Sequence, residues 1–269
     1  MTATLDLDAY LERIRWAGSI RQDFDTLARL LHAHMRQIPF ENLDVLLGRP
    51  IRLDLDSLQD KLVRASRGGY CFEHATLFAA ALQMLGFKPV QHAARVVMIR
   101  PRNASPRTHM FLTVPVAEGR FVVDPGFGAL APRVPVPLIQ GEPARCGEDV
   151  HMMVRDGPYW VLRAQMGDKP IDAWASTLEE ENAADFELGN YYTSTHPESP
   201  FVNRIMLRAL TDDGRITVMN RDLTLWHGNQ PERAQVADRD ALRTLLIERF
   251  GFDLPQVEQL RVPAIPEWA

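Results

Sequence analysis

The sequence predicts an α+β fold in which helices come first, strands follow, and a mixed segment closes the chain. Apolar residues recur at helical spacing through the first third. After Gly86 the chain changes to β-branched or alternating runs separated by Pro, Gly and Asn. Because helices and strands are segregated along the chain rather than alternating, an α+β architecture is favoured.

Three helical segments are expected in the first third. An amphipathic pattern starts at Leu11 and continues over residues 24–35. Pro39 ends it, because proline disfavours a helical conformation in the residue before it. A second helix is expected over residues 57–66. The third, over residues 71–85, is apolar almost all round, which predicts a central and buried element.

The remaining two thirds predict a strand-rich region with a helical end. Strands are expected over residues 90–99, 110–116, 121–123, 159–163 and 205–210. Residues 134–137 are extended, but two prolines make them unsuited to a central strand. Asp212-Asp213-Gly214 predicts a hairpin turn. A last helix is expected over residues 239–250, stopped by Gly251.

The composition excludes several classes of protein. The 269 residues are 46% hydrophobic and 24% charged, which is ordinary for a globular enzyme. A net charge of −5 argues against a protein whose main task is to bind nucleic acid. No apolar run approaches the ~20 residues that span a bilayer, and the first residues lack the features of a secretory signal. We therefore expect a cytoplasmic protein that binds neither membrane nor nucleic acid.

Metal and nucleotide motifs are also missing from the sequence. No Cys-x-x-Cys or His-Glu-x-x-His spacing occurs, so no metal site is expected. The glycine-rich segment 124–128 matches neither the dinucleotide pattern nor the phosphate-loop pattern. The two cysteines, Cys71 and Cys146, are expected to be free thiols, since disulfides are rare in the cytosol.

Cys71 is the candidate nucleophile because of its place in the chain. It follows Gly68-Gly69 and begins the apolar helix, so its thiol meets the positive end of the helix dipole, which favours thiolate. Residues 71, 75, 78, 82 and 85 share one inward face of that helix. Cys146 lies in a loop-like stretch without such a setting and is interpreted as incidental.

A catalytic thiol needs a base, and the base needs a third group that fixes its tautomer. His109 begins an alternating run, Asp124 ends the next, and Glu118-Gly119 predicts a two-residue hairpin turn between them. In that register Thr113 lies opposite Asp124. His109 and Asp124 then share a face but stand four residues apart, about 13 Å. A hydrogen bond needs about 3 Å, so a bulge, a different turn or a strong twist has to close the gap.

Each of these residues also has an ordinary structural interpretation. Cys71 alone fits a small buried hydrophobe, and His109 alone fits a hydrogen-bonded core histidine. Asp124, placed before Pro125-Gly126, fits a turn-initiating aspartate. The constellation becomes specific through the motifs that surround it.

Those motifs resemble the arylamine N-acetyltransferases. Residues 67–73, Arg-Gly-Gly-Tyr-Cys-Phe-Glu, resemble the nucleophile motif of that family, and residues 38–43, Ile-Pro-Phe-Glu-Asn-Leu, resemble its N-terminal signature. Thr108-His109 and residues 123–128, Val-Asp-Pro-Gly-Phe-Gly, follow in the expected order. Residues 190–197 and Phe201 resemble a later family segment. The resemblance spans most of the chain.

The resemblance implies a fold and a set of catalytic roles. Cys71 would accept the acyl group, His109 would be its base, and Asp124 would orient His109. The chain would form an N-terminal helical bundle over residues 1–86, a β-barrel-like domain over 87–200 and a C-terminal α/β lid over 201–269. The catalytic core would be like that of papain-like and transglutaminase-like cysteine enzymes.

The implied reaction moves an acetyl group from acetyl-CoA to an arylamine, arylhydrazine or arylhydroxylamine through an acetyl-cysteine, with ping-pong kinetics. The expected partners are these two small molecules. The residues expected to contact the acceptor are Phe40, Tyr70, Phe127 and Phe201. Those expected to contact the coenzyme are Thr108, Gly126 and Gly128. Arg102, Arg107 and Arg204 would meet its phosphates or be solvated surface charge.

Two departures from the family pattern affect the surroundings of the site. His74 and Ala75 stand where the family usually has Leu-Asn, so a local hydrogen bond of the family must be absent or replaced. Pro125 stands where valine is common, and it lacks an N–H group. Arg67 and Glu41 are expected to form a buried pair that braces the nucleophile loop.

Three other functions stay open on the sequence alone. The same fold would suit another acyl donor, such as propionyl- or malonyl-CoA, or amide formation in secondary metabolism. The same Cys-His-Asp set would serve a transglutaminase-like cysteine hydrolase. A thiol-bearing binding or redox-sensing protein is a third alternative, disfavoured by the intact set of three groups.

Overall fold

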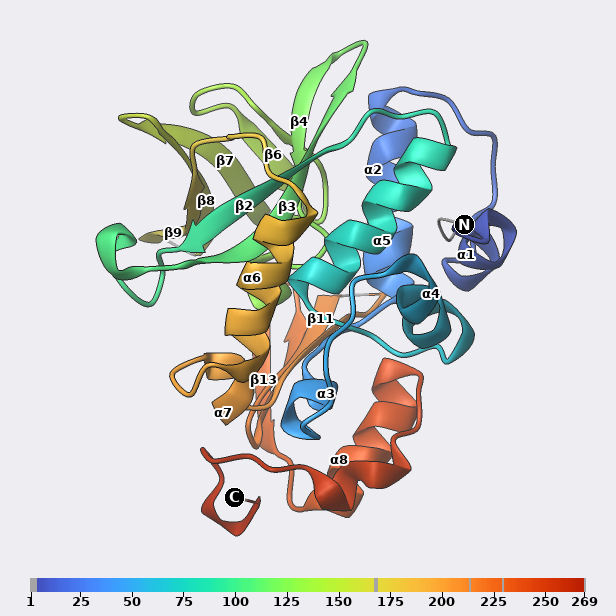
Figure 1. Ribbon diagram of the computed structural model, residues 1–269, viewed down its shortest axis with the longest axis vertical. Helices are drawn as coiled ribbons and strands as arrows, with labels where there is room; N and C mark the ends of the chain where they lie inside the picture. Colours follow the sequence, from blue (N-terminus) through green and yellow to red (C-terminus); the bar gives the residue numbers. More distant parts are fainter. Residues whose placement is uncertain (1–3, 167–168, 213, 229, 269) are drawn as a thin grey trace.

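The computed structural model describes residues 4–166, 169–212, 214–228 and 230–268. It has the predicted mixture of helix and sheet, with helices first, strands next and a mixed C-terminal part (Figure 1). The first helices are α1 (Leu7–Arg13), α2 (Phe24–Gln37), α3 (Leu43–Leu46), α4 (Leu55–Leu58) and α5 (Cys71–Met84), and a π-helical turn, Gln59–Arg64, continues α4. Within the described ranges, no helix combines the length and the apolar character needed to cross a membrane.

Helix α5 is the central element of the helical part (Figure 1). Its Ala and Leu residues are good helix formers, and residues 71, 75, 78 and 82 are each at most 3% exposed. Phe72 and Leu77, on its other sides, are buried as well. Full burial of a side chain such as Phe78 contributes about 1.5–3 kcal/mol. Cys71, the candidate nucleophile, therefore begins a helix that is fixed in the core, as the sequence predicts.

The middle of the chain forms a nearly closed, barrel-like sheet of eight strands. The strands are β2 (Val90–Val96), β3 (Arg107–Val116), β4 (Gly119–Val123), β5 (Val136–Pro137), β6 (Pro143–Cys146), β7 (Asp149–Asp156), β8 (Tyr159–Met166) and β9 (Lys169–Ser176). They are ordered β5-β4-β3-β2-β9-β8-β7-β6. The proline-bearing β5 is an edge strand, as expected. Gly141, between the edge strands β5 and β6, donates its N–H to the Met153 carbonyl oxygen on β7 at 2.8 Å.

The β3–β4 hairpin corrects the predicted register. Val116 pairs with Gly119, so the turn residues are Ala117 and Glu118 rather than Glu118 and Gly119. Leu112 pairs with Val123, which moves the position opposite Asp124 from residue 113 to residue 111. His109 is then two residues from that position instead of four. The expected gap of about 13 Å was wrong because the turn begins one residue earlier than the glycine suggested.

A second sheet of five strands pairs one short strand of the N-terminal part with four strands of the C-terminal part. Its strands are β1 (Phe40–Glu41), β10 (Met206–Leu210), β11 (Gly214–Met219), β12 (Asp222–His227) and β13 (Gln230–Gln235), in that order. The expected hairpin joins β10 to β11, although Asp213 lies outside the described residues. Helix α8 (Arg239–Leu245) continues as a π-helical turn, Leu246–Phe250, and ends at Gly251 with φ 78°. The predicted stop is confirmed.

Helices α6 (Ala183–Thr195) and α7 (Pro200–Asn203) have no counterpart among the helices expected from the periodicity. Asn182 caps α6 by accepting the Ala184 N–H at 3.0 Å. α6 passes in front of the barrel and beside α5 (Figure 1). A Cβ atom on Gly189 would lie 2.9 Å from the Phe72 ring, so this glycine permits close packing between α6 and α5.

Candidate active site

Cys71 is the first residue of α5, where backbone N–H groups lack partners within the helix. Its side chain is 3% exposed, and Sγ lies 3.7 Å from the Thr108 carbonyl oxygen. Glu73 closes the helix start by accepting the Tyr70 N–H at 3.0 Å. The Cys71 side chain therefore lies at the electropositive N-terminal end of the helix, where negative charge is stabilised.

The turn after β4 lies directly against the nucleophile. A Cβ atom added to Gly126 would be 2.6 Å from the Cys71 Cα atom, so only glycine allows this approach. Gly128 has a φ of +69°, in the region that favours glycine. Gly126 thus brings the segment that carries Asp124 into contact with the start of α5, and Gly128 lies against the Phe40 ring.

His109 and Asp124 form a buried hydrogen bond. His109 Nε2 lies 2.8 Å from Asp124 Oδ2, and the two side chains are 2% and 0% exposed. The same oxygen accepts the Trp174 Nε1–H at 2.9 Å, and Oδ1 accepts the Gly126 N–H at 3.3 Å. Because Nε2 is occupied by the carboxylate, Nδ1 is the ring nitrogen that remains for the Cys71 thiol. Sequence reasoning missed Trp174, which lies on a strand that the patterns did not predict.

The pKa of His109 is set by opposing effects. Burial lowers it, but the charge and hydrogen bond of Asp124, followed by the Cys71 sulfur, raise the pKa of His109 to about 10. The edge of the Phe127 ring packs on the imidazole with ring centroids 4.8 Å apart. The raised pKa makes the imidazole of His109 well suited to accept and hold a proton from the neighbouring Cys71 thiol.

The thiol and imidazole open onto one cavity of about 580 Å³. Of the residues predicted to contact substrates, six line this cavity: Phe40, Thr108, Gly126, Phe127, Gly128 and Phe201. Tyr70 is fully buried and packs on Phe201, with ring centroids 5.2 Å apart. The volume is in the range of small-molecule sites.

The basic residues considered from the sequence or seen at the cavity differ in their surroundings. Arg100, Arg204 and Arg208 line the cavity. Arg102 is paired with Asp156 at the surface, and Arg107 Nη1 lies 2.5 Å from Glu181 Oε1. Cys146 lines a separate surface hollow beside Arg133 and is not part of the site. Within the described ranges no group of His, Cys, Asp and Glu side chains is arranged to hold a metal ion.

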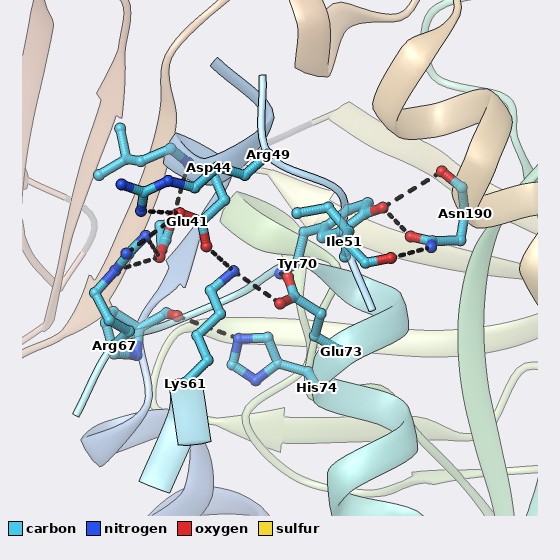
Figure 2. Close-up of polar contacts among 12 residues, drawn as sticks. Glu41, Asp44, Arg49, Ile51, Lys61, Arg67, Tyr70, Glu73, His74 and Asn190 are labelled. Atoms are coloured by element: carbon cyan, nitrogen blue, oxygen red, sulfur yellow. Dashed lines mark hydrogen bonds and ion pairs between the residues drawn. The ribbon is translucent and has the colours of Figure 1, made fainter. Parts of the chain in front are cut away.

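A buried ion-pair network holds the nucleophile loop, as Figure 2 shows. Arg67 donates to Glu41 Oε1 from Nε at 3.0 Å and from Nη2 at 2.5 Å, so the expected pair is present. Lys61 Nζ joins Asp44 Oδ2 at 2.8 Å to Glu73 Oε1 at 2.7 Å. Burial lowers the pKa of Lys61, but the three carboxylates raise it above its usual range. The network ties residues 41–44 to the first turn of α5.

Comparison with known proteins places this arrangement in a family. A family profile described as N-acetyltransferase matches residues 23–259. The arylamine N-acetyltransferase of Mycolicibacterium smegmatis is 36% identical over 93% of each chain, and that of Escherichia coli (strain K12) is 34% identical over 91% of this chain and 88% of its own.

The chain belongs to the arylamine N-acetyltransferase family.

Solved structures agree with this. The Mycobacterium marinum arylamine N-acetyltransferase in complex with CoA has a TM-score of 0.89 and 34% identity, over 94% of each chain. The M. tuberculosis enzyme has a TM-score of 0.87 and 37% identity, over 92% of this chain and 94% of its own. The family and the mixed fold expected from the motifs are therefore confirmed.

His74, one of the departures from the arylamine N-acetyltransferase pattern, belongs to a buried hydrogen-bond chain. Its Nε2 lies 3.2 Å from the Pro39 carbonyl oxygen, and its Nδ1 lies 2.8 Å from His34 Nε2. His34 Nδ1 lies 2.8 Å from the Tyr10 hydroxyl. Because a carbonyl only accepts, His74 Nε2 donates to it, His34 Nε2 donates to His74, and Tyr10 donates to His34.

This chain requires both imidazole rings to be neutral. Burial lowers the pKa of His74 to about 4, and burial, followed by the proximity of His74, lowers the pKa of His34 well below its usual value. The Pro39 carbonyl oxygen also accepts the Gly69 N–H at 3.2 Å. His74 thus ties α5 to the loop that precedes Cys71, while Ala75 is a fully buried apolar contact.

Proposed function

We propose that this chain transfers an acetyl group from acetyl-CoA to an arylamine, with Cys71, His109 and Asp124 as its catalytic groups. The observation that carries the proposal is the 2.8 Å bond between His109 Nε2 and Asp124 Oδ2, beside a thiol at a helix start. Membership of the arylamine N-acetyltransferase family and the CoA complex of the M. marinum relative support the same activity.

In the first half of the reaction the acetyl group moves from one sulfur to another. His109 takes the Cys71 proton, and the thiolate attacks the thioester carbonyl carbon. The backbone N–H groups in the first turn of α5 stabilise the oxyanion. Collapse of the intermediate breaks the bond between carbon and the coenzyme sulfur, and His109 returns the proton to that sulfur. One thioester replaces another, so loading Cys71 carries no steep thermodynamic penalty.

In the second half the acetyl group moves from sulfur to nitrogen. Aromatic amines are weak bases, so the amine is neutral near pH 7 and its lone pair attacks the acetyl carbon. His109 accepts a proton from the nitrogen as the intermediate forms. Collapse breaks the bond between carbon and Cys71 Sγ and releases the amide. Because coenzyme A leaves before the amine reacts, the kinetics are ping-pong.

The acceptor ring and the thioester occupy different parts of the cavity in this proposal. The acceptor ring packs among Phe40, Phe127 and Phe201, all of which line the cavity, with Tyr70 bracing Phe201. The thioester end of the coenzyme runs along Thr108, Gly126 and Gly128. The glycines suit this role because they let a ligand approach the backbone closely.

We propose the divisions 1–86, 87–200 and 201–269 as a helical bundle, a β-barrel-like domain and an α/β lid. The division is supported by the eight-stranded sheet, all of whose strands fall within 87–200. A papain-like and transglutaminase-like core fits a thiol at a helix start facing a histidine and an aspartate from neighbouring strands. In this division β1 belongs to the helical bundle and pairs with β10 of the lid.

The test is the mass of the intact protein after brief mixing with acetyl-CoA. Wild type should gain one acetyl group and lose it on addition of aniline, whereas Cys71→Ala should gain none. Initial rates at several concentrations of both substrates should give the parallel double-reciprocal lines of a ping-pong reaction.

Other donors and acceptors are separate arms of the same test. A Salmonella typhimurium relative, 33% identical, is named both arylamine N-acetyltransferase and N-hydroxyarylamine O-acetyltransferase, so an arylhydroxylamine is included as an acceptor. Loading by propionyl- or malonyl-CoA but not by acetyl-CoA would assign a different donor. No adduct with any acyl-CoA, together with release of free acid, would favour a cysteine hydrolase and overturn the proposal.

A further inference from the structure

A buried charged side chain faces the active-site cavity in addition to the proposed catalytic groups. Arg208, on β10, lines the same cavity as Cys71 and His109, yet its side chain is only 5% exposed. Among the described residues its Nε atom is buried and has no hydrogen-bond partner. Its Nη2 atom makes one long contact, 3.5 Å, to the Ala131 carbonyl oxygen. A buried guanidinium with so few acceptors is unusual, since buried polar groups are normally satisfied.

The backbone holds Arg208 in place. β10 is paired on both sides, with Arg208 opposite Phe40 on β1 and opposite Thr217 on β11. Phe40 and Thr217 also line the cavity. Since side chains alternate along a strand, the neighbouring Leu207 and Ala209 fill the core on the other side of the sheet. The paired backbone therefore directs the Arg208 side chain to the cavity side of the sheet.

The charges around Arg208 leave it without a counterion. The two carboxylates whose charge acts on it are Asp149 and Asp124. Asp149 pairs with Arg133 at 2.9 Å and with Arg215 at 3.5 Å. Asp124 is bound to the catalytic histidine. Burial, followed by the nearby Arg215, lowers the pKa of Arg208 to about 9, so the group is still a cation at neutral pH.

We propose that Arg208 binds a carboxylate on the ring of the acceptor, so that this enzyme prefers anionic arylamines. The inference rests on the proposed acetyl transfer and adds the chemistry of the acceptor. A guanidinium matches a carboxylate with two parallel hydrogen bonds, and a bound carboxylate would supply the missing counterion and acceptors.

The position of Arg208 favours the acceptor over the coenzyme as the source of the anion. Arg208 adjoins the segment that follows Asp124, through Ala131, and its charge reaches both Asp124 and His74. In an aminobenzoate a single ring separates the amine from the carboxylate. In acetyl-CoA the long pantetheine arm separates the thioester from the phosphates. The shorter span of an aminobenzoate suits an arginine that lines the same cavity as Cys71 and His109 and adjoins the segment after Asp124.

The experiment compares 4-aminobenzoate with its neutral isostere 4-aminobenzamide. Wild type should show a higher kcat/KM for the anion, and Arg208→Met, which keeps the length but removes the charge, should lose about 10- to 100-fold on the anion alone. Arg208→Lys should recover part of the lost kcat/KM, because lysine keeps the positive charge but lacks the two parallel N–H donors of the guanidinium. Arg239→Met is the matched control: Arg239 also has an unpartnered Nε, but it stacks on Trp268 instead of lining the cavity.

Other outcomes overturn the inference. If wild type has equal kcat/KM values for the two amines, the inference is overturned, and no variant is needed to show it. A slower acetylation of Cys71 by acetyl-CoA in Arg208→Met, with the two amines affected equally, assigns Arg208 to the coenzyme phosphates instead. Calorimetric titration of wild type with each amine, without acetyl-CoA, measures the preference even if no acetyl transfer occurs. It therefore separates a failure of this inference from a failure of the proposed activity.

Discussion

Replacing Asp124 with Asn isolates the charge of the proposed catalytic carboxylate while keeping its shape. Three N–H groups point at this carboxylate, from His109, Trp174 and Gly126. An amide has only one acceptor oxygen, so its NH2 group must face one of them. The weakest bond, to Gly126 at 3.3 Å, is the one to be lost. The main effect is then the missing negative charge beside His109.

The size of that effect follows from the pKa of His109. A value of about 10 instead of 6.5 is a preference of about 5 kcal/mol for the imidazolium form. Without the Asp124 charge, burial lowers the pKa and the ring becomes neutral, so the thiolate loses its partner. The part of the pKa increase that comes from Cys71 remains in this variant. We therefore expect acetylation of Cys71 to slow about 1000-fold.

Two measurements check this prediction. Quenched-flow mass spectrometry gives the acetylation rate, and alkylation by iodoacetamide across pH reports the thiolate. At neutral pH the thiol of Asp124→Asn should be alkylated more slowly than the wild-type thiol, because His109 no longer holds the thiol proton. Trp174→Phe is the matched control, because it removes one donor from the same oxygen and keeps the charge. If Asp124→Asn acetylates within about tenfold of wild type, the charge of Asp124 does not drive the reaction.

Three further predictions concern stability and packing. The folded pKa of His74, about 4, lies below its unfolded value of about 6.5. Its contribution of about 3 kcal/mol to the free energy of unfolding is therefore present above pH 6.5 and lost as pH falls toward 4. In urea unfolding, the stability of His74→Leu should depend less on pH than that of wild type. Lys61→Met leaves Asp44 and Glu73 buried without their shared cation, and thermal unfolding should show a loss of about 3–5 kcal/mol; an unchanged Tm would contradict the network. Gly126→Ala places a methyl group 2.6 Å from the Cys71 Cα atom, so the acetylation rate should fall about 100-fold while the far-ultraviolet circular dichroism stays the same. A rate close to wild type would mean that the turn can move away without cost.

The local features of this fold were predictable because short stretches of sequence determine them. Helix α2 ends at Gln37, before Ile38-Pro39, since proline restricts the residue that precedes it. The last helical segment stops at Gly251, which adopts a left-handed conformation. The start of α5 at Cys71 follows from the glycine pair and the apolar run after it. Each of these depends on neighbours in the chain.

Features that depend on distant partners were not predictable in the same way. The turn at Ala117-Glu118 differs from the expected one by a single residue, which the flanking apolar pattern cannot distinguish. Helix α6 exposes Leu188 and Tyr191, so its apolar residues give no helical stripe. Lys61 and Trp174 acquire their roles only when separate segments pack together.

The pairing of β1 with β10 has a consequence for how the protein is made. Phe40 and Glu41 emerge early from the ribosome, but their partners, Arg208 and Leu207, are synthesised more than half a chain later. Until then the loop before Cys71 has an unpaired strand edge on one side, and the cavity lacks the wall that carries Arg208. A nascent chain that already contains Cys71, His109 and Asp124 therefore has no finished active site. The cavity is therefore completed only after β10 has been synthesised, although its three proposed catalytic residues are made much earlier.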